Sequence, residues 1–198
     1  MSFRIEEKIL IEKNKIIEFK KIYQEKFLKK LHQPRLIKSL YFENLSNDLY
    51  KDSVEGTLPR KKIRVRSYPN DKKNQLYLEK KISSFEGRFK LKQEIDKLNF
   101  EKIIRYGVYD DNYGYCKPLI YVEYNRCYYI LDKTRITHDS NIKYYLFKSK
   151  IIKHEKNDIF EIKANFNTDI DELYKIFPMN RSRFSKYCNG FQKFFIEA

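Results

Sequence analysis

The sequence predicts an α+β fold in which a β-barrel with a charged interior is covered by a few α-helices. Three observations predict it: strand-like runs fill most of the chain, charged residues recur at every second position in them, and a few segments have helical spacing. Because 198 residues suit one compact core, we expect a single domain over residues 1–198.

The first third of the chain combines both patterns. Residues 3–11 alternate charged and apolar side chains and predict a strand. From residue 14 to residue 31, apolar residues recur at three- and four-residue steps, which predicts an amphipathic helix that ends before Pro34. Residues 36–43 then predict the next strand.

Three further strands are expected in the middle of the chain, at 60–68, 75–82 and 87–95, with turn-forming residues between them. Residues 95–107 predict a short helix that Gly107 ends.

The last third returns to strands. Runs rich in β-branched and aromatic residues predict strands at 119–131, 135–142 and 158–166. Thr168 and Asp171 resemble a capping pair that opens a helix near 169–177.

The charged positions of these strands predict a shared enclosed space. Lys62, Arg64 and Arg66 alone could form a solvated sheet edge, but several strands repeat the pattern and a sheet has only two edges. A barrel lets the charged faces point inward and leaves apolar pairs such as Ile63 and Val65, or Leu76 and Leu78, for covering helices such as 14–31. Facing cations repel each other, so we expect an anion between them.

The composition also indicates a polyanionic partner. Lysine and arginine outnumber aspartate and glutamate by 42 to 27, which gives a formal charge of +15. Nucleic acid, polyphosphate, nucleotides and an anionic membrane surface are all candidates on charge alone. The sequence has no specific nucleic-acid-binding motif, and a partner among membrane proteins stays unknown.

Cysteine usage and hydropathy indicate a cytoplasmic location. Cys116, Cys127 and Cys188 have neither disulfide-framework nor zinc-site spacing, which favours a reducing compartment. No segment approaches the about 18 uninterrupted apolar residues of a transmembrane helix, and the N-terminus does not resemble a signal peptide.

The order of several motifs resembles the VTC (vacuolar transporter chaperone-like) domain of the triphosphate tunnel metalloenzyme, or CYTH-like, superfamily. The matching stretches are RIEEK, SLYFE, KIRVRSY, LEKK, GRFKLK, YNRCYY with RITHD, FEIK and RFSKY, and they span nearly the whole chain. The resemblance implies that the barrel is the eight-stranded antiparallel β-barrel, or triphosphate tunnel, of that superfamily.

The resemblance implies a polyphosphate polymerase that transfers the terminal phosphoryl group of ATP to a growing inorganic polyphosphate chain, assisted by Mn²⁺ or Mg²⁺. Such a transfer needs in-line positioning and charge neutralisation of the phosphoryl oxygens more than covalent chemistry by the protein. The implied catalytic and phosphate-binding residues are Lys8, Arg64, Arg66, Arg126, Arg135 and Lys186. Further substrate-binding candidates are Lys62, Lys81, Arg88, Lys90, Tyr124 and Lys163.

Glu161 is the first candidate metal ligand that the resemblance implies, followed by Glu6 and Glu79, because Mg²⁺ and Mn²⁺ prefer oxygen ligands. Each site residue also has an ordinary explanation. Arg126 and Arg135 could form structural ion pairs with Asp139 or Glu123, and Glu161 could pair with an arginine. Lys80 and Lys81 compete for one inward position, and the two-residue spacing from Glu79 favours Lys81.

Two other functions stay open. Glu6 puts a carboxylate on the first strand, as in hydrolytic tunnel enzymes, so the chain could be a triphosphatase acting on tripolyphosphate, a nucleoside triphosphate or an RNA 5′-triphosphate. The net charge would also suit a non-catalytic polyphosphate- or RNA-binding module.

Overall fold

The computed structural model describes residues 4–25, 29–71, 73, 75–165 and 167–197. These residues form two compact units, which are described one at a time. The first unit is built from residues 1–35, 124–142 and 155–184, and the second from residues 36–123, 143–154 and 185–198. One domain over residues 1–198 stays a prediction.

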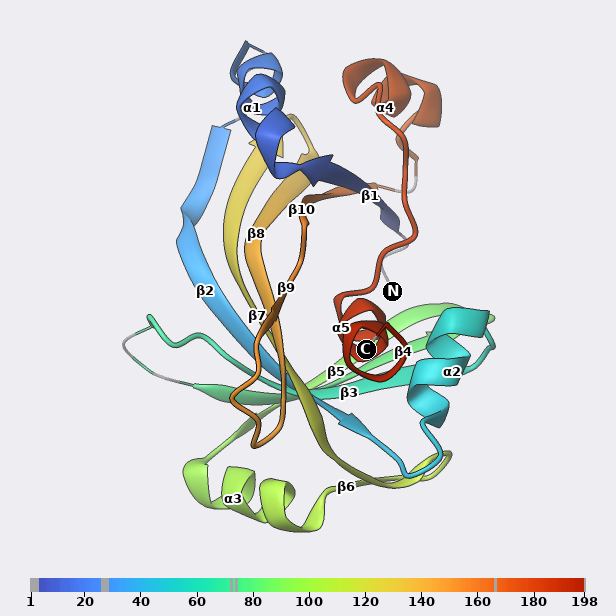
Figure 1. The fold of residues 1–198 in the computed structure, drawn as a ribbon. Helices are drawn as coiled ribbons and strands as arrows, with labels where there is room; N and C mark the ends of the chain where they lie inside the picture. Colours follow the sequence, from blue (N-terminus) through green and yellow to red (C-terminus); the bar gives the residue numbers. More distant parts are fainter. Residues whose placement is uncertain (1–3, 26–28, 72, 74, 166, 198) are drawn as a thin grey trace. The chain divides into compact units, whose positions relative to one another are not determined.

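Eight strands follow one another in a hydrogen-bonded order, β1-β10-β8-β7-β2-β3-β4-β5, and β6 and β9 pair with β7 and β8 (Figure 1). The pairs whose register is known are all antiparallel. This confirms the predicted antiparallel α+β class and its eight main strands. The order has two ends, β1 and β5, so hydrogen bonds between the described strands do not close it, and a barrel describes the fold only approximately.

The strands have the following bounds: β1 Arg4–Glu12, β2 Lys29–Glu43, β3 Arg60–Ser67, β4 Leu76–Ser84, β5 Gly87–Ile95, β6 Val108–Asp110, β7 Gly114–Leu131, β8 Thr134–Leu146, β9 Lys153–His154 and β10 Asn157–Asn165. The helices are η1 Lys13–Lys15, α1 Ile16–Glu25, α2 Asp48–Glu55, α3 Lys97–Tyr106, α4 Ile170–Ile176 and α5 Lys186–Phe195.

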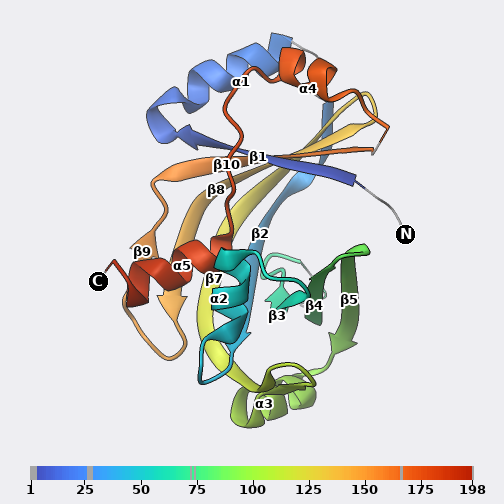
Figure 2. The ribbon, with the colours of Figure 1, turned by 90° about the vertical axis from the view of Figure 1, so that its right-hand side faces the viewer.

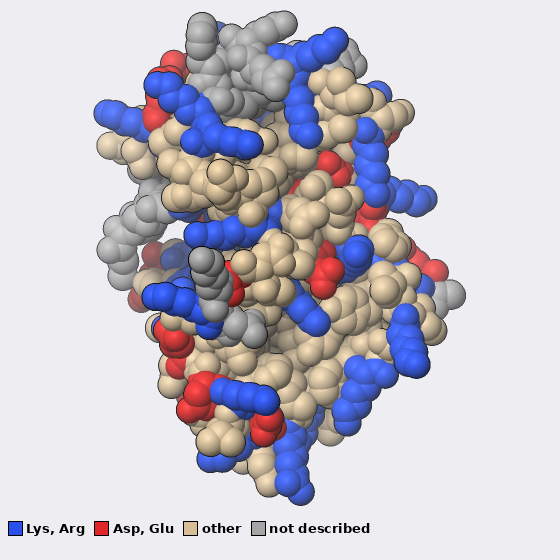
Figure 3. Space-filling view, turned by 90° about the vertical axis from the view of Figure 1, so that its left-hand side faces the viewer, with Lys and Arg blue, Asp and Glu red and all other residues tan. Residues whose placement is uncertain are grey.

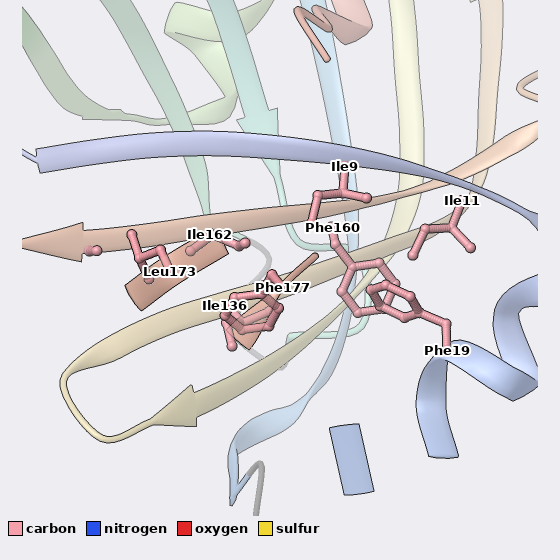
Figure 4. Close-up of a cluster of buried hydrophobic side chains, with 9 residues drawn as sticks. Ile9, Ile11, Phe19, Ile136, Phe160, Ile162, Leu173 and Phe177 are labelled. Carbon is pink, nitrogen blue, oxygen red and sulfur yellow. The ribbon is translucent and has the colours of Figure 1, made fainter. Parts of the chain in front are cut away.

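The core of the first unit lies between its sheet and two helices. Figures 2 and 4 show α1 and α4 on the side of β1, β10 and β8 where the apolar residues gather. Phe19 of α1 packs on Phe160 of β10, with ring centroids 4.3 Å apart, and Leu173 of α4 joins the same cluster (Figure 4). Ile9, Phe160 and Ile162 therefore face the helices, and the alternate positions, such as Lys8, Glu161 and Lys163, face the other way.

The second unit has a separate core on the apolar face of β2, β3 and β4. Ile63 and Val65 are buried there, and Leu76 and Leu78 pack against them. The covering helix is α3, which contributes Phe100, Ile103 and Ile104. The expectation that the helix predicted at 14–31 covers this face was wrong, because Phe19 of α1 belongs to the core of the first unit.

Helix α5 is fixed closely within the second unit, where it lies beside α2 (Figure 2). The Tyr187 hydroxyl donates to Glu43, whose carboxylate also accepts from the backbone N–H groups of Leu49 and Tyr50 in α2. At Gly190, an added Cβ would lie 2.7 Å from the Tyr144 ring, so the helix approaches the strands more closely than any larger residue would permit.

Three sequence expectations need correction. The helix predicted over 14–31 ends at Glu25, and residues 29–31 belong to β2, while 26–28 lie outside the described residues. Strand β2 is much longer than the predicted 36–43. The residue that caps α4 is Asp169, whose side chain accepts from the Asp171 N–H, and not Thr168.

Helices α2 and α5 were not expected, although the other predicted elements lie close to observed ones. Among the described residues, no helix is long and apolar enough to span a membrane.

Candidate functional site: two charged sheet faces

Charge alone does not locate a site on this protein. Lysine and arginine side chains are spread over the face that Figure 3 shows, with acidic side chains among them. Strand register is a sharper criterion, because directly opposed residues of antiparallel strands point to the same side of a sheet. Followed in this way, most of the predicted site residues that lie on strands share one face in each unit.

In the second unit, β3, β4 and β5 form a basic face. Lys62 lies opposite Lys81, and Lys81 lies opposite Lys90. In the next row, Arg64 lies opposite Glu79. The charged residues that the register places on this basic face are Arg60, Lys62, Arg64, Arg66, Glu79, Lys81, Arg88, Lys90, Lys92 and Glu94.

Glu79 lies at the centre of the basic face and is 1% exposed. Its Oε2 accepts from Arg64 Nε at 2.8 Å and from Arg64 Nη2 at 2.6 Å. Its Oε1 is 2.5 Å from Lys90 Nζ, and Arg66 Nε lies 3.9 Å from Oε2. One carboxylate therefore holds three cations, two of which are candidate phosphate-binding arginines.

The pKa of Glu79 reflects these neighbours. Burial by itself would raise the pKa, but Arg64 and Arg66, together with hydrogen bonds from Lys90 and Arg64, outweigh burial and lower it to about 2. Burial also lowers the pKa values of Lys62 and Lys90. The basic face is thus a place where positive charge is held at some electrostatic cost.

Tyr41 of β2 is the aromatic partner of this face. Its hydroxyl accepts from Arg64 Nη1 at 2.8 Å, and its ring stacks on Tyr187 of α5 with centroids 5.0 Å apart. Burial opposes ionisation of the hydroxyl, but Arg64, Arg66 and Lys62 together lower its pKa from 10.0 to about 8. This phenol is poised near neutral pH and adjacent to a candidate phosphate ligand.

The start of α5 lies at the same face. Lys62 Nζ donates to the Ser185 hydroxyl at 2.8 Å, and that hydroxyl caps α5 by accepting from the Cys188 N–H. Lys186, the first residue of α5, is partly exposed next to it. The helix end therefore brings Lys186 into the neighbourhood of Lys62.

The two lysines that competed for one inward position are separated by the strand pleat. Lys81 shares the side of Glu79, whereas Lys80 points to the other side and binds Asp110 at 2.9 Å. Lys61 of β3 binds the same carboxylate at 2.8 Å. The spacing argument for Lys81 thus agrees with the observed face.

In the first unit, β1, β10 and β8 form a face of mixed charge. Lys8 lies opposite Glu161, and Glu6 lies opposite Lys163, which lies opposite Arg135. The charged residues of this mixed face include Glu6, Lys8, Arg126, Arg135, Asp139, Glu161 and Lys163, and Glu12 at the end of β1 lies on the same side.

Arg126 has the strongest pairing on the mixed face. Its Nε and Nη2 donate to the two oxygens of Asp139 at 2.5 and 2.7 Å, and Asp139 is fully buried. Nη2 also lies 3.5 Å from Glu161 Oε2. Burial alone would lower the pKa of Arg126, but Asp139 and its neighbours raise it well above its usual range. The ion pair with Asp139 that the sequence left open is present.

Lys163 joins two carboxylates, with its Nζ 3.2 Å from Glu161 Oε1 and 3.7 Å from Glu6 Oε1. Lys8 Nζ donates to the Phe184 carbonyl.

Arg126 lies over the ring of Tyr124, which is buried, and Arg135 is exposed. The first unit thus contains seven of the fifteen predicted site residues, namely Glu6, Lys8, Tyr124, Arg126, Arg135, Glu161 and Lys163. The second unit contains the other eight, which are Lys62, Arg64, Arg66, Glu79, Lys81, Arg88, Lys90 and Lys186.

The carboxylates of the mixed face could hold part of a metal shell. Glu6 and Glu161 lie on neighbouring strands, point to one side of the sheet and share Lys163. Among the described residues no three acidic, histidine or cysteine side chains gather as a metal-binding group. Two hard oxygen donors suit Mg²⁺ or Mn²⁺ if phosphate oxygens complete the coordination. Glu79 fits less well, because Arg64 and Lys90 engage both its oxygens.

Sequence reasoning missed three residues of these faces as participants. Tyr41 and Glu43 lie in the SLYFE stretch but carried no charge-pattern signal, and Tyr187 lies in a helix that was not expected. A buried tyrosine opposite an arginine is visible only once the register of β2 and β3 is known.

Solved structures share this fold over nearly their whole length. A Bacillus halodurans protein with a proposed adenylate cyclase assignment aligns with a TM-score of 0.63 at 15% identity, covering 98% of each chain. A conserved hypothetical protein from Pyrococcus furiosus aligns at 0.60 and 16%, covering 94% of this chain and 99% of its own.

A Hippeastrum protein, whose structure is described as revealing a dominant triphosphatase activity, aligns at 0.57 and 16%, covering 96% of each chain. No curated protein sequence matches the chain.

The chain therefore belongs to the class of proteins that share the fold of these solved structures, an antiparallel sheet with covering helices. The model of the VTC domain matches residues 3–195, and the chain belongs to the VTC domain family.

Proposed function

We propose that this protein is a polyphosphate polymerase that transfers the terminal phosphoryl group of ATP to the end of an inorganic polyphosphate chain and releases ADP. Membership of the VTC domain family supports this proposal. The observation that carries it is the basic face, where Arg64, Arg66 and Lys90 surround one carboxylate.

A phosphate chain is the ligand that matches such a face. Each phosphate unit carries negative charge at short, regular intervals, and the rows of β3, β4 and β5 repeat cations at the strand spacing. Arginine can grip two phosphate oxygens at once, while lysine adds a mobile point charge. In the proposed reaction Arg64 and Arg66 orient the reacting phosphates, and Lys62, Lys81, Arg88, Lys90 and Lys186 hold the remainder of the chain.

The mixed face has a second role in the proposal. Lys8, Arg126, Arg135 and Lys163 neutralise phosphoryl oxygens, and Tyr124 supports Arg126. Glu161 and Glu6 are the residues that would hold Mn²⁺ or Mg²⁺. When bound, such an ion neutralises charge on the phosphoryl oxygens during transfer.

The test is direct. The purified chain is incubated with ATP and Mn²⁺, and polymer, ADP and orthophosphate are separated on a gel and quantified. We expect polymer and ADP in wild type, and no polymer with Arg64→Ala. A wild-type protein that forms no polymer from any nucleoside triphosphate, with Mn²⁺ or Mg²⁺, would contradict the proposal.

Hydrolysis of triphosphates is the second candidate, and the position of Glu6 favours it. Glu6 and Glu161 lie on either side of Lys163, so a second carboxylate is within the same charged group as the first metal-ligand candidate. Release of orthophosphate from tripolyphosphate or ATP, without polymer, would select this activity. Glu6→Gln should then reduce hydrolysis more than it reduces nucleotide binding.

A further inference from the structure

Glu79 has a position that metal binding does not explain. It lies opposite Arg64, between the rows of Lys62 and Arg66, and it is almost completely buried. Oε2 accepts hydrogen bonds from two nitrogens of Arg64, and Oε1 forms an ion pair with Lys90 Nζ at 2.5 Å. A metal ion at Glu79 would have to displace these cations and lie among positive charges, which is electrostatically unfavourable.

The contacts of Glu79 resemble those that a phosphate group would receive. Arg64 donates through Nε and Nη2, the two nitrogens on one edge of its fork, which is the edge arginine uses towards carboxylates and phosphates. Arg66 is slightly farther, at 3.9 Å, and Lys90 approaches from β5. The carboxylate thus brings cations of β3 and β5 to one point.

We infer that Glu79 is an internal stand-in for phosphate, a positioning residue that gathers Arg64, Arg66 and Lys90 and competes with the incoming phosphate chain for them. The inference rests on the proposed function, because it assumes that the basic face binds phosphate.

Two consequences follow from the charge. Without Glu79, the three cations repel one another, so the empty protein is less stable. The same loss removes the competitor, so a phosphate chain binds more tightly. If Glu79 were merely structural, its loss would lower the stability but would not tighten phosphate binding. If Glu79 were a metal ligand, its loss would not tighten phosphate binding in the absence of metal.

The chain offers a matched control on the same strands. Asp110 is also buried and is held by Lys61 and Lys80, but it lies on the opposite side of β3 and β4. Asp110→Asn removes one buried negative charge without touching the basic face. Glu79→Asp keeps the charge at Glu79 and shortens the side chain by one methylene group.

The experiment measures binding of tripolyphosphate by isothermal titration calorimetry in EDTA, so that no metal contributes, together with thermal unfolding with and without tripolyphosphate. For Glu79→Gln we expect the dissociation constant to fall about tenfold, with a lower melting temperature in the empty protein and a larger increase on ligand addition. Glu79→Asp should stay within about twofold of wild type, and Asp110→Asn should show no tightening.

The outcomes separate the two proposals. If wild type does not bind tripolyphosphate, the proposed function fails. If wild type binds and Glu79→Gln binds equally or more weakly, the role of Glu79 as a competitor is overturned. If Asp110→Asn binds tripolyphosphate more tightly by the same factor, the role of Glu79 is also overturned, because the effect would then come from the change in net charge.

If Glu79→Gln does not fold without ligand, circular dichroism is recorded with and without tripolyphosphate. Recovery of the fold when tripolyphosphate is added supports the role of Glu79 as a stand-in for phosphate, and no recovery overturns it.

Discussion

The basic face of the second unit and the mixed face of the first unit use similar residues but differ in the share of acidic side chains, which is much larger on the mixed face. Around Glu79, one acid serves Arg64, Arg66 and Lys90. On the mixed face, Arg126 and Lys163 are shared among Asp139, Glu161 and Glu6. The basic face therefore has positive charge to offer an anion, whereas the mixed face has already neutralised most of its own.

This difference teaches that an arginine in a charged strand can have one of two roles: it can share a carboxylate with other cations, or it can be the main partner of a buried carboxylate. Arg64 is held by a carboxylate that its neighbours also hold, so its loss leaves Glu79 with other partners. Arg126 is the bidentate partner of a fully buried aspartate, so its loss exposes that aspartate to an unfavourable environment. The predictions below test the distinction.

The largest effect is expected at Arg126. Arg126→Ala should lower the free energy of unfolding by about 3–5 kcal/mol, because the buried carboxylate of Asp139 loses its bidentate partner. Urea denaturation followed by circular dichroism measures the change. The double variant Arg126→Met with Asp139→Asn should recover most of the stability, and failure to do so would show that the pair is not the cause.

Arg64→Ala should act on activity more than on stability. We expect polymer synthesis, or triphosphate hydrolysis, to fall about 10²–10³-fold, as is typical when one group that stabilises developing charge is removed. The unfolding midpoint should shift less than that of Arg126→Ala, because Lys90 and Arg66 still accompany Glu79. A stability loss equal to that of Arg126→Ala would remove the proposed contrast between the faces.

Metal dependence should separate the two faces next. Glu161→Gln should raise the Mn²⁺ concentration needed for half-maximal activity about tenfold, since an oxygen donor of full charge is lost. Glu79→Gln should leave that concentration within about twofold of wild type if Glu79 is no ligand. Titration of Mn²⁺ at saturating ATP measures this concentration for both variants. A larger increase in Glu79→Gln than in Glu161→Gln would place the metal on the basic face instead.

The smallest effect is a pH dependence at Tyr41. As pH rises through about 8, the hydroxyl of Tyr41 becomes a tyrosinate beside Arg64, and negative charge there repels phosphate. Tripolyphosphate affinity should therefore fall several-fold more in wild type than in Tyr41→Phe between about pH 7 and 9. The ratio of the two affinities cancels the ionisation of the ligand itself, and a constant ratio would contradict the prediction.

The sequence predicted those parts of the fold whose pattern is local. β1, β3, β5 and β10 alternate charged and apolar side chains, and their observed bounds lie close to the predicted ones. The face that each residue occupies follows from the same alternation, as with Lys81 and Lys80.

Other parts depend on tertiary contacts that no local pattern carries. The first half of β2 is exposed and contains Pro34, so it has no buried face to mark it as a strand. The helical spacing of the apolar residues before it continues to residue 31, and the predicted helix therefore overlaps the start of β2. The pairing of Arg126 with Asp139 joins residues of two strands, and only their register makes it visible. Helix α5, Lys186–Phe195, has aromatic residues but no apolar aliphatic ones, so its sequence carries only a weak helical pattern.

Gly190 of α5 fixes the distance between this helix and the strand that carries Tyr144. Because no larger side chain fits between Gly190 and the Tyr144 ring, the helix sits at one depth, and so does the lysine that begins it. Replacing Gly190 with alanine would lift the C-terminal segment outward and carry Lys186 with it. One added methyl group at Gly190 would thereby change the position of the Lys186 ammonium group at the start of α5, close to Lys62 of β3.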